Sequence, residues 1–234
     1  MNIVLFEKNE CNGILNRDDY RAKHIINVLK LSIGDTFTAG IVNKDYGSAQ
    51  ITLIDDQHIE YTYNRKNDGL PLYPITLLVG QVRPISMKRI LREAVMLGVK
   101  KIIISGCDLT ERSYENAKIW SEGEYKKYLL DGAMQAGSPH ISDVELIPSI
   151  QKVPLNYDNL LLLDNVLTST PLSKQHFSGS VLVAIGPERG FSDKERNYFL
   201  THGFTPHTMG NRILRTETAC AVASSLCLSC MNYL

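Results

Sequence analysis

The chain has 234 residues, of which 44% are hydrophobic, and its formal net charge is zero. This length suits one large domain or two smaller ones, and the hydrophobic content supports a buried core, which excludes a largely disordered chain. The zero net charge excludes binding to nucleic acid by bulk charge alone, and without a signal peptide or a long apolar run we expect a cytoplasmic protein with no membrane span.

The first 68 residues are expected to form a small β-rich domain with one helix. A short strand at 3–6 precedes a helix at 18–31, where apolar residues recur at helical spacing. Three further strands are expected at 36–42, 49–54 and 59–63, the first two joined by a hairpin turn at 45–47. Basic side chains in this region either contact RNA phosphates or form a solvated face, and they are Arg17, Arg21, Lys23 and Lys30.

The segment 64–74 is polar and then rich in glycine and proline, which is typical of a linker between domains. Strands and helices alternate after it, which predicts an α/β domain with a largely parallel sheet. Strands are expected at 75–79, 101–105, 144–147, 160–163, 181–185 and 204–208. Helices are expected from Pro84 to Gly98, at 120–135 and at 216–231. The strand at 160–163 ends at Asp164, on the sheet edge that should face a ligand.

Two stretches each pass from a strand through a glycine turn into a helix. In IGPERGFSDKE (185–195), glycines force a tight turn, and Ser192 with Glu195 forms a capping-box pattern. In MGNRILRTETA (209–219), the strand ends at Gly210 and Thr216 is expected to cap the next helix. Such turns bring backbone N–H groups close to a ligand, although neither matches a known phosphate loop, and each alone could be an ordinary turn.

Together, the two stretches resemble motifs of the RsmE family of ribosomal RNA methyltransferases, IGPEGGFS and LGxRILRTETA. HxxxVLKLxxGD, here at 24–35, similarly resembles the PUA-like RNA-binding domain at the front of these proteins. The resemblance implies a PUA-like domain at 1–68 and, at 75–234, a SPOUT-class α/β methyltransferase domain with a C-terminal trefoil knot. It implies a homodimeric enzyme of ribosomal RNA processing and ribosome biogenesis, which binds no metal ion and does not associate with a membrane. Such an enzyme methylates the ring nitrogen between the two carbonyls of a uridine in small-subunit ribosomal RNA, with S-adenosylmethionine as the methyl donor.

The resemblance also implies functional residues. Methyl transfer needs a site that holds the methyl carbon in line with its acceptor and excludes water, which glycines and apolar residues provide well. The cofactor candidates, from three strand-end loops, are Leu163, Ile185, Gly186, Glu188, Gly190, Met209, Gly210, Arg212, Ile213, Leu214 and Ala219. Because the acceptor nitrogen is mostly protonated, a base or a cation must favour its anion, and the candidates are Arg112, Arg215 and Glu217. Further RNA-binding candidates are Arg83, Lys88 and Arg89.

The chain departs from the family pattern at Arg189, where a second glycine is usual, and in the helix at 83–99. The matching motifs therefore support the predicted cofactor and reaction class more strongly than they support the predicted target nucleotide. Three alternatives remain: a non-catalytic RNA-binding or ribosome-assembly factor with this fold, a methyltransferase of another RNA position, and an enzyme that binds a nucleotide phosphate at the Gly186 turn.

The final helix consists mostly of small apolar residues on nearly all its sides. This composition predicts that the helix packs in the core on one side and forms a subunit interface on another. A symmetric homodimer contact is expected at Ala219, Ala223 and Leu226. Cys227 and Cys230 lie in this helix without a second cysteine pair or a nearby histidine, so buried thiols are expected rather than a metal or redox site.

Overall fold

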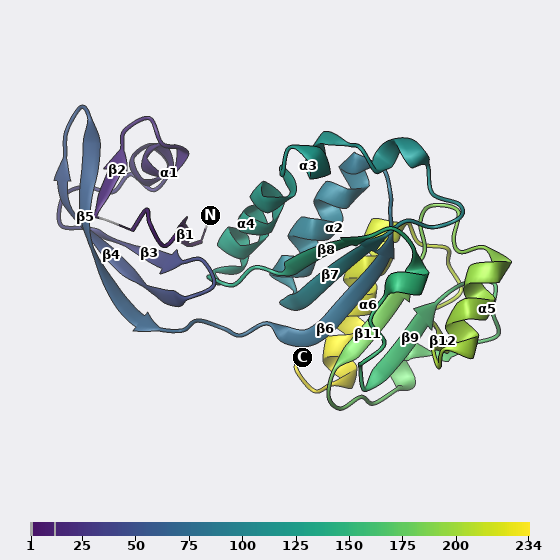
Figure 1. The fold of residues 1–234 in the computed structure, drawn as a ribbon. Helices are drawn as coiled ribbons and strands as arrows, with labels where there is room; N and C mark the ends of the chain where they lie inside the picture. Colours follow the sequence, from purple (N-terminus) through teal and green to yellow (C-terminus); the bar gives the residue numbers. More distant parts are fainter. Residues whose placement is uncertain (1, 12) are drawn as a thin grey trace. The chain divides into compact units, whose positions relative to one another are not determined.

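A computed structural model describes residues 2–11 and 13–234 of the chain. It divides into two compact units (Figure 1). The first unit runs to Pro71 and also contains Ala133–Ile141, and the second unit contains Leu72–Gly132 and Ser142–Leu234. In the described part of the chain, no helix has the length and apolar character needed to cross a membrane.

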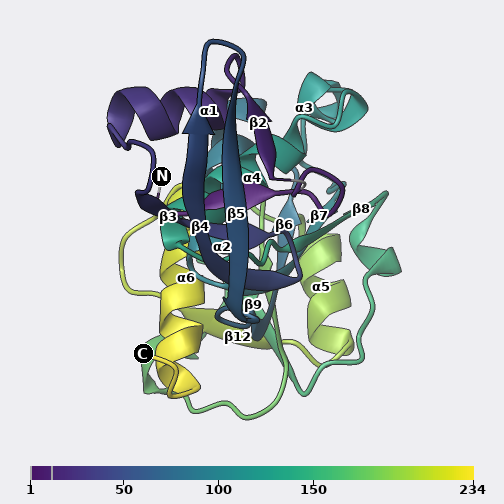
Figure 2. The same cartoon turned by 90° about the vertical axis from the view of Figure 1, so that its left-hand side faces the viewer.

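The first unit is built on a five-stranded sheet in the order β1-β3-β4-β5-β2. Its strands are β1 (Val4–Phe6), β2 (Ile14–Asn16), β3 (Thr36–Ile41), β4 (Asp45–Ile54) and β5 (His58–Asn67). Strand β1 pairs with β3 in parallel, and the other pairs are antiparallel; Figure 2 shows β4 and β5 as two long neighbouring strands. Alternate residues of β4 point into an apolar core that includes Phe6, Ile25 and Ile59.

The helix expected at 18–31 is only partly correct. It is a short helix α1 (Tyr20–Lys23) that continues as one π-helical turn (His24–Val28). A π-turn holds more residues than an α-turn, so it shifts the side chains that follow it around the helix axis, although Ile26 still packs against the core. Val28 and Leu29 are consequently 64% and 40% exposed, and not buried as their spacing suggests.

Two boundaries in this unit also differ from the expectation. The hairpin turn lies at 42–44, where Asn43 has a φ of 53°, and not at 45–47. Asp45 therefore begins β4 and is buried. Strand β5 continues to Asn67 and the next strand begins at Tyr73, so the stretch between them is shorter than the linker expected at 64–74.

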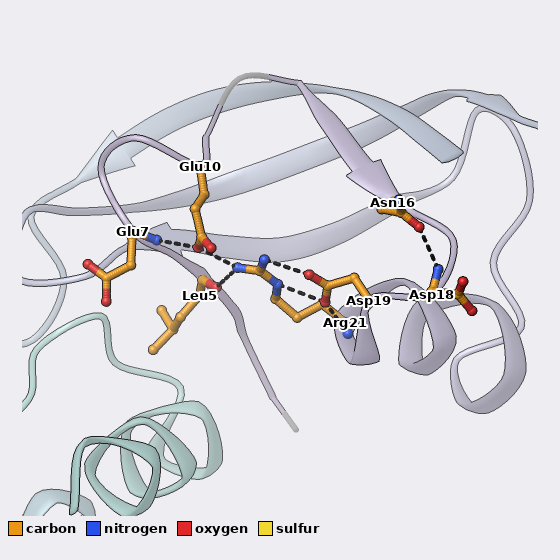
Figure 3. Close-up of polar contacts among 7 residues, drawn as sticks. All are labelled: Leu5, Glu7, Glu10, Asn16, Asp18, Asp19 and Arg21. Carbon is orange, nitrogen blue, oxygen red and sulfur yellow. Dashed lines mark hydrogen bonds and ion pairs between the residues drawn. The ribbon is translucent and has the colours of Figure 1, made fainter. Parts of the chain in front are cut away.

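Arg21, a candidate for RNA binding, is part of the interior of the first unit (Figure 3). Its guanidinium lies 2.7 Å from Asp19 Oδ2 and 2.8 Å from Glu10 Oε2, and it donates a hydrogen bond to the Leu5 carbonyl. The same group stacks over the Phe6 ring at 5.2 Å. Since Arg21 is only 9% exposed and its donors face protein acceptors, the prediction that it contacts RNA is wrong.

The second unit is built on a seven-stranded sheet in the order β10-β12-β9-β11-β6-β7-β8, with every neighbouring pair parallel (Figure 1). The strands are β6 (Tyr73–Gly80), β7 (Val99–Ser105), β8 (Asp143–Ile147), β9 (Asn159–Leu163), β10 (Thr170–Pro171), β11 (Val181–Ile185) and β12 (Thr205–Thr208). The parallel α/β sheet is confirmed, and six of its strands lie where periodicity places them. Only the two-residue edge strand β10 was not expected.

The helices of this unit are α2 (Pro84–Met96), α3 (Lys118–Ser121), α4 (Tyr125–Ala136), whose last turn belongs to the first unit, α5 (Asp193–Thr201) and α6 (Thr216–Cys230). Pro84 begins α2 and Gly98, with a φ of 71°, follows its end, as expected. The single helix expected at 120–135 is two helices, because the chain turns at Gly123, whose φ is 70°.

Helix α6 packs against α2, β6 and β11, and it corrects two expectations. Thr216 is its first residue and not its cap; its hydroxyl donates instead to the Gly186 carbonyl at 3.3 Å. Ala219 and Ala223 are buried within the chain, so they are not available for a contact between subunits. The open side of α6 is an apolar groove shared with α2, lined by Glu93, Met96, Leu97, Ala221, Val222, Ser225 and Leu226.

Candidate active site

Three loops of the second unit meet at the carboxyl edge of its sheet. Strands β12, β9 and β11 are neighbours, and Leu163 lies level with both Ile185 and His207. Parallel strands in register release their following loops at one edge, which is where open α/β sheets bind ligands. The loops after these strands line a cavity of about 680 Å³, a size typical of small-molecule sites.

The turn after β11 requires its glycines. A Cβ on Gly186 would lie 2.9 Å from Gly190 Cα, so a side chain there would collide with backbone atoms. Gly190 has a φ of 72°, and its N–H donates to the Pro187 carbonyl at 2.8 Å, which closes the turn. Helix α5 then starts with the expected capping box between Ser192 and Glu195. The backbone of this turn is therefore presented to the cavity in one fixed shape.

The cavity brings together every one of the cofactor candidates, although they are spread over more than fifty positions of the chain. Leu163, Ile185 and Ala219 are buried beneath it. The others that line it are Gly186, Glu188, Gly190, Met209, Gly210, Arg212, Ile213 and Leu214. Two catalytic candidates, Arg215 and Glu217, and the RNA candidate Arg83 also line it.

A family model described as RNA methyltransferase domain matches residues 68–228. Over 98% of this chain, the sequence is 36% identical to ribosomal RNA small subunit methyltransferase E of Treponema pallidum, of which 91% is covered. The chain belongs to the RsmE family. Methyltransferase E 1 of Borreliella burgdorferi is 30% identical over 98% of each protein. The resemblance to the RsmE family, which the two motifs indicated, is thus confirmed.

Members of the RsmE family share this fold. A solved structure of methyltransferase E from Neisseria gonorrhoeae bound to S-adenosyl methionine has a TM-score of 0.75 at 21% identity, and the match covers 99% of this chain and 98% of that one. At this identity the likeness extends to the arrangement of strands and helices and not to individual side chains.

Several residues of this RsmE-family cavity were not among the candidates from the sequence. Those that line it are Ser86, Asp164, Asn165, Val166, Pro187, Arg189, Phe191, Arg196, His207, Thr208 and Thr216. Two of them could have been found from the sequence, because Asp164 directly follows a buried strand and Arg189 stands within the glycine turn. Nothing in the sequence marks Arg196 as a site residue, because it lies within α5 and reaches the cavity only through the packing of that helix.

His207 lies at the end of β12 and is 3% exposed. Its Nδ1 lies 3.1 Å from the Thr170 hydroxyl oxygen, which links β12 to the edge strand β10. Burial lowers the pKa of His207, while a hydrogen bond between its ring and the Thr170 backbone acts in the opposite direction. A neutral imidazole therefore lines the cavity at neutral pH.

Glu217 is one of the buried acids of the site, with Asp164. It lies in the first turn of α6, is 7% exposed, and has an oxygen 3.8 Å from Arg89 Nη1. Near it, burial raises the pKa of Glu93, against the lowering effect of Arg89 and with a further raising effect of Glu217. Arg89 thus faces two carboxylates of its own unit, and it does not line the cavity.

The two remaining basic candidates of this unit also lie outside the cavity lining. Lys88 pairs with Glu124 at 3.8 Å and lies over the Tyr128 ring, and its contact with Tyr128 raises the pKa of its ammonium group. Arg112 is exposed and begins a short 3₁₀ turn after β7.

The loop that carries Arg112 is nevertheless tied to the cavity wall. Asp108 accepts a hydrogen bond from the Ser192 hydroxyl at 2.6 Å, and its N–H donates to Glu195 at 3.0 Å. Gln81, after β6, donates to the Tyr114 carbonyl at 2.6 Å. The loop after β7 is therefore fixed to the start of α5 and to the end of β6, at the same sheet edge as the cavity.

Proposed function

We propose that this protein transfers a methyl group from S-adenosylmethionine to the ring nitrogen of a uridine in small-subunit ribosomal RNA. The observation that carries the proposal is the convergence of the RsmE-family motif residues on a single cavity at the carboxyl edge of the parallel sheet. Family membership supports the reaction class and the RNA substrate. The methyltransferase E of Neisseria gonorrhoeae, which shares the fold, was solved with S-adenosyl methionine bound.

The open space and the apolar floor of the cavity support the assignment of the cofactor. Around the position of a Gly210 Cβ, no protein atom lies within 4 Å, so the backbone there is open to a ligand. The floor is apolar, with Leu163 and Ile185 buried, and Ile213 is 83% exposed at the cavity. Such surroundings suit an adenosine and a methionyl chain, with the Gly186 turn supplying backbone hydrogen-bond donors and acceptors. The cofactor, when bound, supplies an electrophilic methyl group.

We assign the acceptor side of the reaction to charged residues of the cavity and of the loop after β7. We assign Arg215, exposed at the start of α6, to stabilise the negative charge that develops on the uridine as its ring nitrogen loses a proton. Glu217, held by Arg89, is the candidate to accept that proton. Arg112 is the candidate for a second cation, placed by the Asp108 anchor of its loop.

We propose the PUA-like assignment for the first unit and the trefoil knot for the end of the second. The knot is supported by strand order, since β12 lies beside β9 while the following helix α6 packs on β11 and β6. The chain consequently returns past β9 between β12 and α6. The PUA-like assignment is supported by the five-stranded sheet with its short helix, and it makes this unit the RNA-holding part of the enzyme.

The test of the function is to map modified nucleosides in small-subunit ribosomal RNA from cells with and without this protein. We expect one methylated uridine to be lost, and to be restored by purified enzyme with S-adenosylmethionine. A different lost position identifies a methyltransferase with another target. Cofactor binding with no RNA methylated indicates a ribosome-assembly factor, and thermal stabilisation by ATP alone indicates a nucleotide enzyme.

The basic residues that stay exposed in the first unit are expected to contribute to RNA binding. Replacing Lys23 and Lys30 with alanine should weaken RNA binding and reduce the salt slope by about 1.4, the value for two phosphate contacts on single-stranded RNA. The affinity for S-adenosylmethionine should not change. Alanines at Lys8 and Lys66, also exposed, are the charge-matched control. Equal effects of the two double variants would argue against a specific RNA-binding face.

The groove between α2 and α6 is proposed as the homodimer contact, in place of the buried alanines. Replacing the half-buried Leu226 with arginine would put a charge into this apolar groove, so we expect a monomer in sedimentation at micromolar concentration. Leu200, 43% exposed on α5 and outside the groove, provides the control substitution to arginine. A wild-type monomer at the same concentration would contradict the assignment.

A further inference from the structure

We infer that Arg196 and Asp164 form a positioning pair that sets the affinity of the cavity for its cofactor, an inference that rests on the proposed function. Asp164 lies directly after β9, and Arg196 lies in α5. Arg196 Nε is 2.9 Å from Asp164 Oδ2, and the two side chains are 14% and 2% exposed. Both residues line the cavity.

The carboxylate of Asp164 holds the loop after β9 in place. Its Oδ1 accepts a hydrogen bond from the Val166 N–H at 2.8 Å, while Oδ2 accepts from Arg196. Val166 is 66% exposed and lines the cavity next to Asn165, so its own side chain does not fix this part of the wall, although the following Leu167 packs against the core. At Asn165 and Val166 the two hydrogen bonds that Asp164 accepts therefore hold the wall in its conformation.

The guanidinium of Arg196 also lies against the second cofactor loop. A Cβ built on Gly190 would be 3.6 Å from Arg196 Nη2, which is van der Waals contact. One side chain thus pairs with the loop after β9 and lies beside the loop after β11, and these loops form two of the three walls of the cavity. Lysine carries the same charge but lacks the planar fork that makes these contacts together.

Arg196 has a second ion pair, and it is exposed. Its Nη1 lies 2.9 Å from Asp193 Oδ1, but the Asp193 side chain is 99% exposed. A solvent-exposed pair contributes little, whereas removing one partner of a buried pair leaves the other charge without compensation. The contact with Asp164 is therefore the one that shapes the site, and Asp193 provides a matched control on the same arginine.

Because the Asp164 side chain is almost fully buried, it acts on the cofactor through the loop and not by contact. Loss of the pair should loosen binding of the cofactor while leaving the chemical step intact once the cofactor is bound. For Arg196→Met we expect the Kd and the KM for S-adenosylmethionine to rise at least about tenfold, or ~1.4 kcal/mol. The KM for RNA should be unchanged, and kcat at saturating cofactor should fall less than about threefold.

The experiment measures cofactor binding by calorimetry and steady-state kinetics on the full-length chain with ribosomal RNA. Arg196→Lys should restore part of the affinity, and Asp193→Asn should stay within about twofold of wild type. The double variant Asp164→Asn with Arg196→Met should lose no more affinity than the weaker-binding single variant, because the two residues act as a unit. If Arg196→Met does not fold, Arg196→Lys carries the same comparison.

The outcomes separate this inference from the proposed function. Wild-type protein that binds S-adenosylmethionine, together with an Arg196→Met variant that binds it equally well, overturns the positioning role alone. An equal loss in Asp193→Asn and Arg196→Met also overturns it, because the exposed pair would then matter as much as the buried one. Wild-type protein that does not bind S-adenosylmethionine overturns both.

Discussion

Replacing Gly210 with valine is expected to abolish binding of S-adenosylmethionine to an otherwise folded protein. Gly210 has a φ of 111°, which a β-branched residue adopts only with strain. The space beside its Cα contains no protein atom within 4 Å and belongs to the cavity wall, so the valine methyl groups would occupy the volume of the ligand. We expect the Kd to rise at least about 100-fold, or ~2.7 kcal/mol, in titration calorimetry.

The control for this prediction separates backbone strain from filling of the cavity. Gly34, in the first unit, has a φ of 94° and likewise no atom within 4 Å of its Cβ position. Valine at position 34 should introduce comparable strain and leave the affinity for S-adenosylmethionine unchanged. A folded Gly210→Val variant that binds the cofactor normally would remove Gly210 from the site.

Replacing Arg21 with methionine is expected to destabilise the first unit by about 3 kcal/mol, the lower end for breaking a buried ion pair, because Glu10 keeps some contact with solvent. The substitution would leave Asp19 and Glu10 without their cation and would remove a donor from the Leu5 carbonyl. The measurement is native-state hydrogen exchange of the β3, β4 and β5 amides, since it reports the opening of one unit separately.

The same ion cluster should make the first unit sensitive to acid. Hydrogen bonding to Arg21 lowers the pKa of Glu10. At Asp19, burial acts to raise the pKa, but the hydrogen bonds from Arg21 outweigh it, so the pKa is also lowered. Stability from lowered carboxyl pKa values is fully present above their ordinary values near ~4 and is lost as the pH falls through the lower, folded values. The free energy of unfolding of the wild-type unit should therefore decrease below about pH 4, and this decrease should be smaller in Arg21→Met.

A nearby exposed pair is the control for both measurements. Lys23 lies 3.3 Å from Asp18, with side chains 55% and 96% exposed. Asp18→Asn should change the opening free energy by less than about 0.5 kcal/mol. Unchanged exchange rates in the Arg21→Met variant would show that the buried cluster contributes no net stability. Apolar replacement of a buried ion pair is sometimes neutral in this way.

Strands β9 and β11 beside the candidate active site could be predicted because each contains a short apolar run between polar or turn residues. The run at β11 and the leucines of β9 identify buried parallel strands, and the glycine motifs follow directly from them. The convergence of the cofactor candidates followed from the family motifs, whose residues all come from the loops at one sheet edge.

What the sequence could not show depends on side-chain partners that are distant in the chain. Arg21 and Arg196 look like surface charges among other charges, and only the packed structure shows Asp19 and Asp164 beside them. The helix around Ile25 has ordinary helical spacing, and nothing in that spacing signals a π-turn. Small residues suit a contact within the chain as well as one between subunits, so the sequence alone could not show that Ala219 and Ala223 are buried within the chain.

The membership of Ala133–Ile141 in the first unit has a consequence for synthesis on the ribosome. Asn43 donates its N–H to the Pro139 carbonyl at 3.0 Å and accepts a hydrogen bond from the Ile141 N–H at 3.0 Å. These contacts cannot form until α2, β7, α3 and α4 of the second unit have been translated. Domains generally fold in the order of their synthesis, but here the amino-terminal unit is completed only after 61 of the 154 residues of the second unit, about two fifths, have been translated.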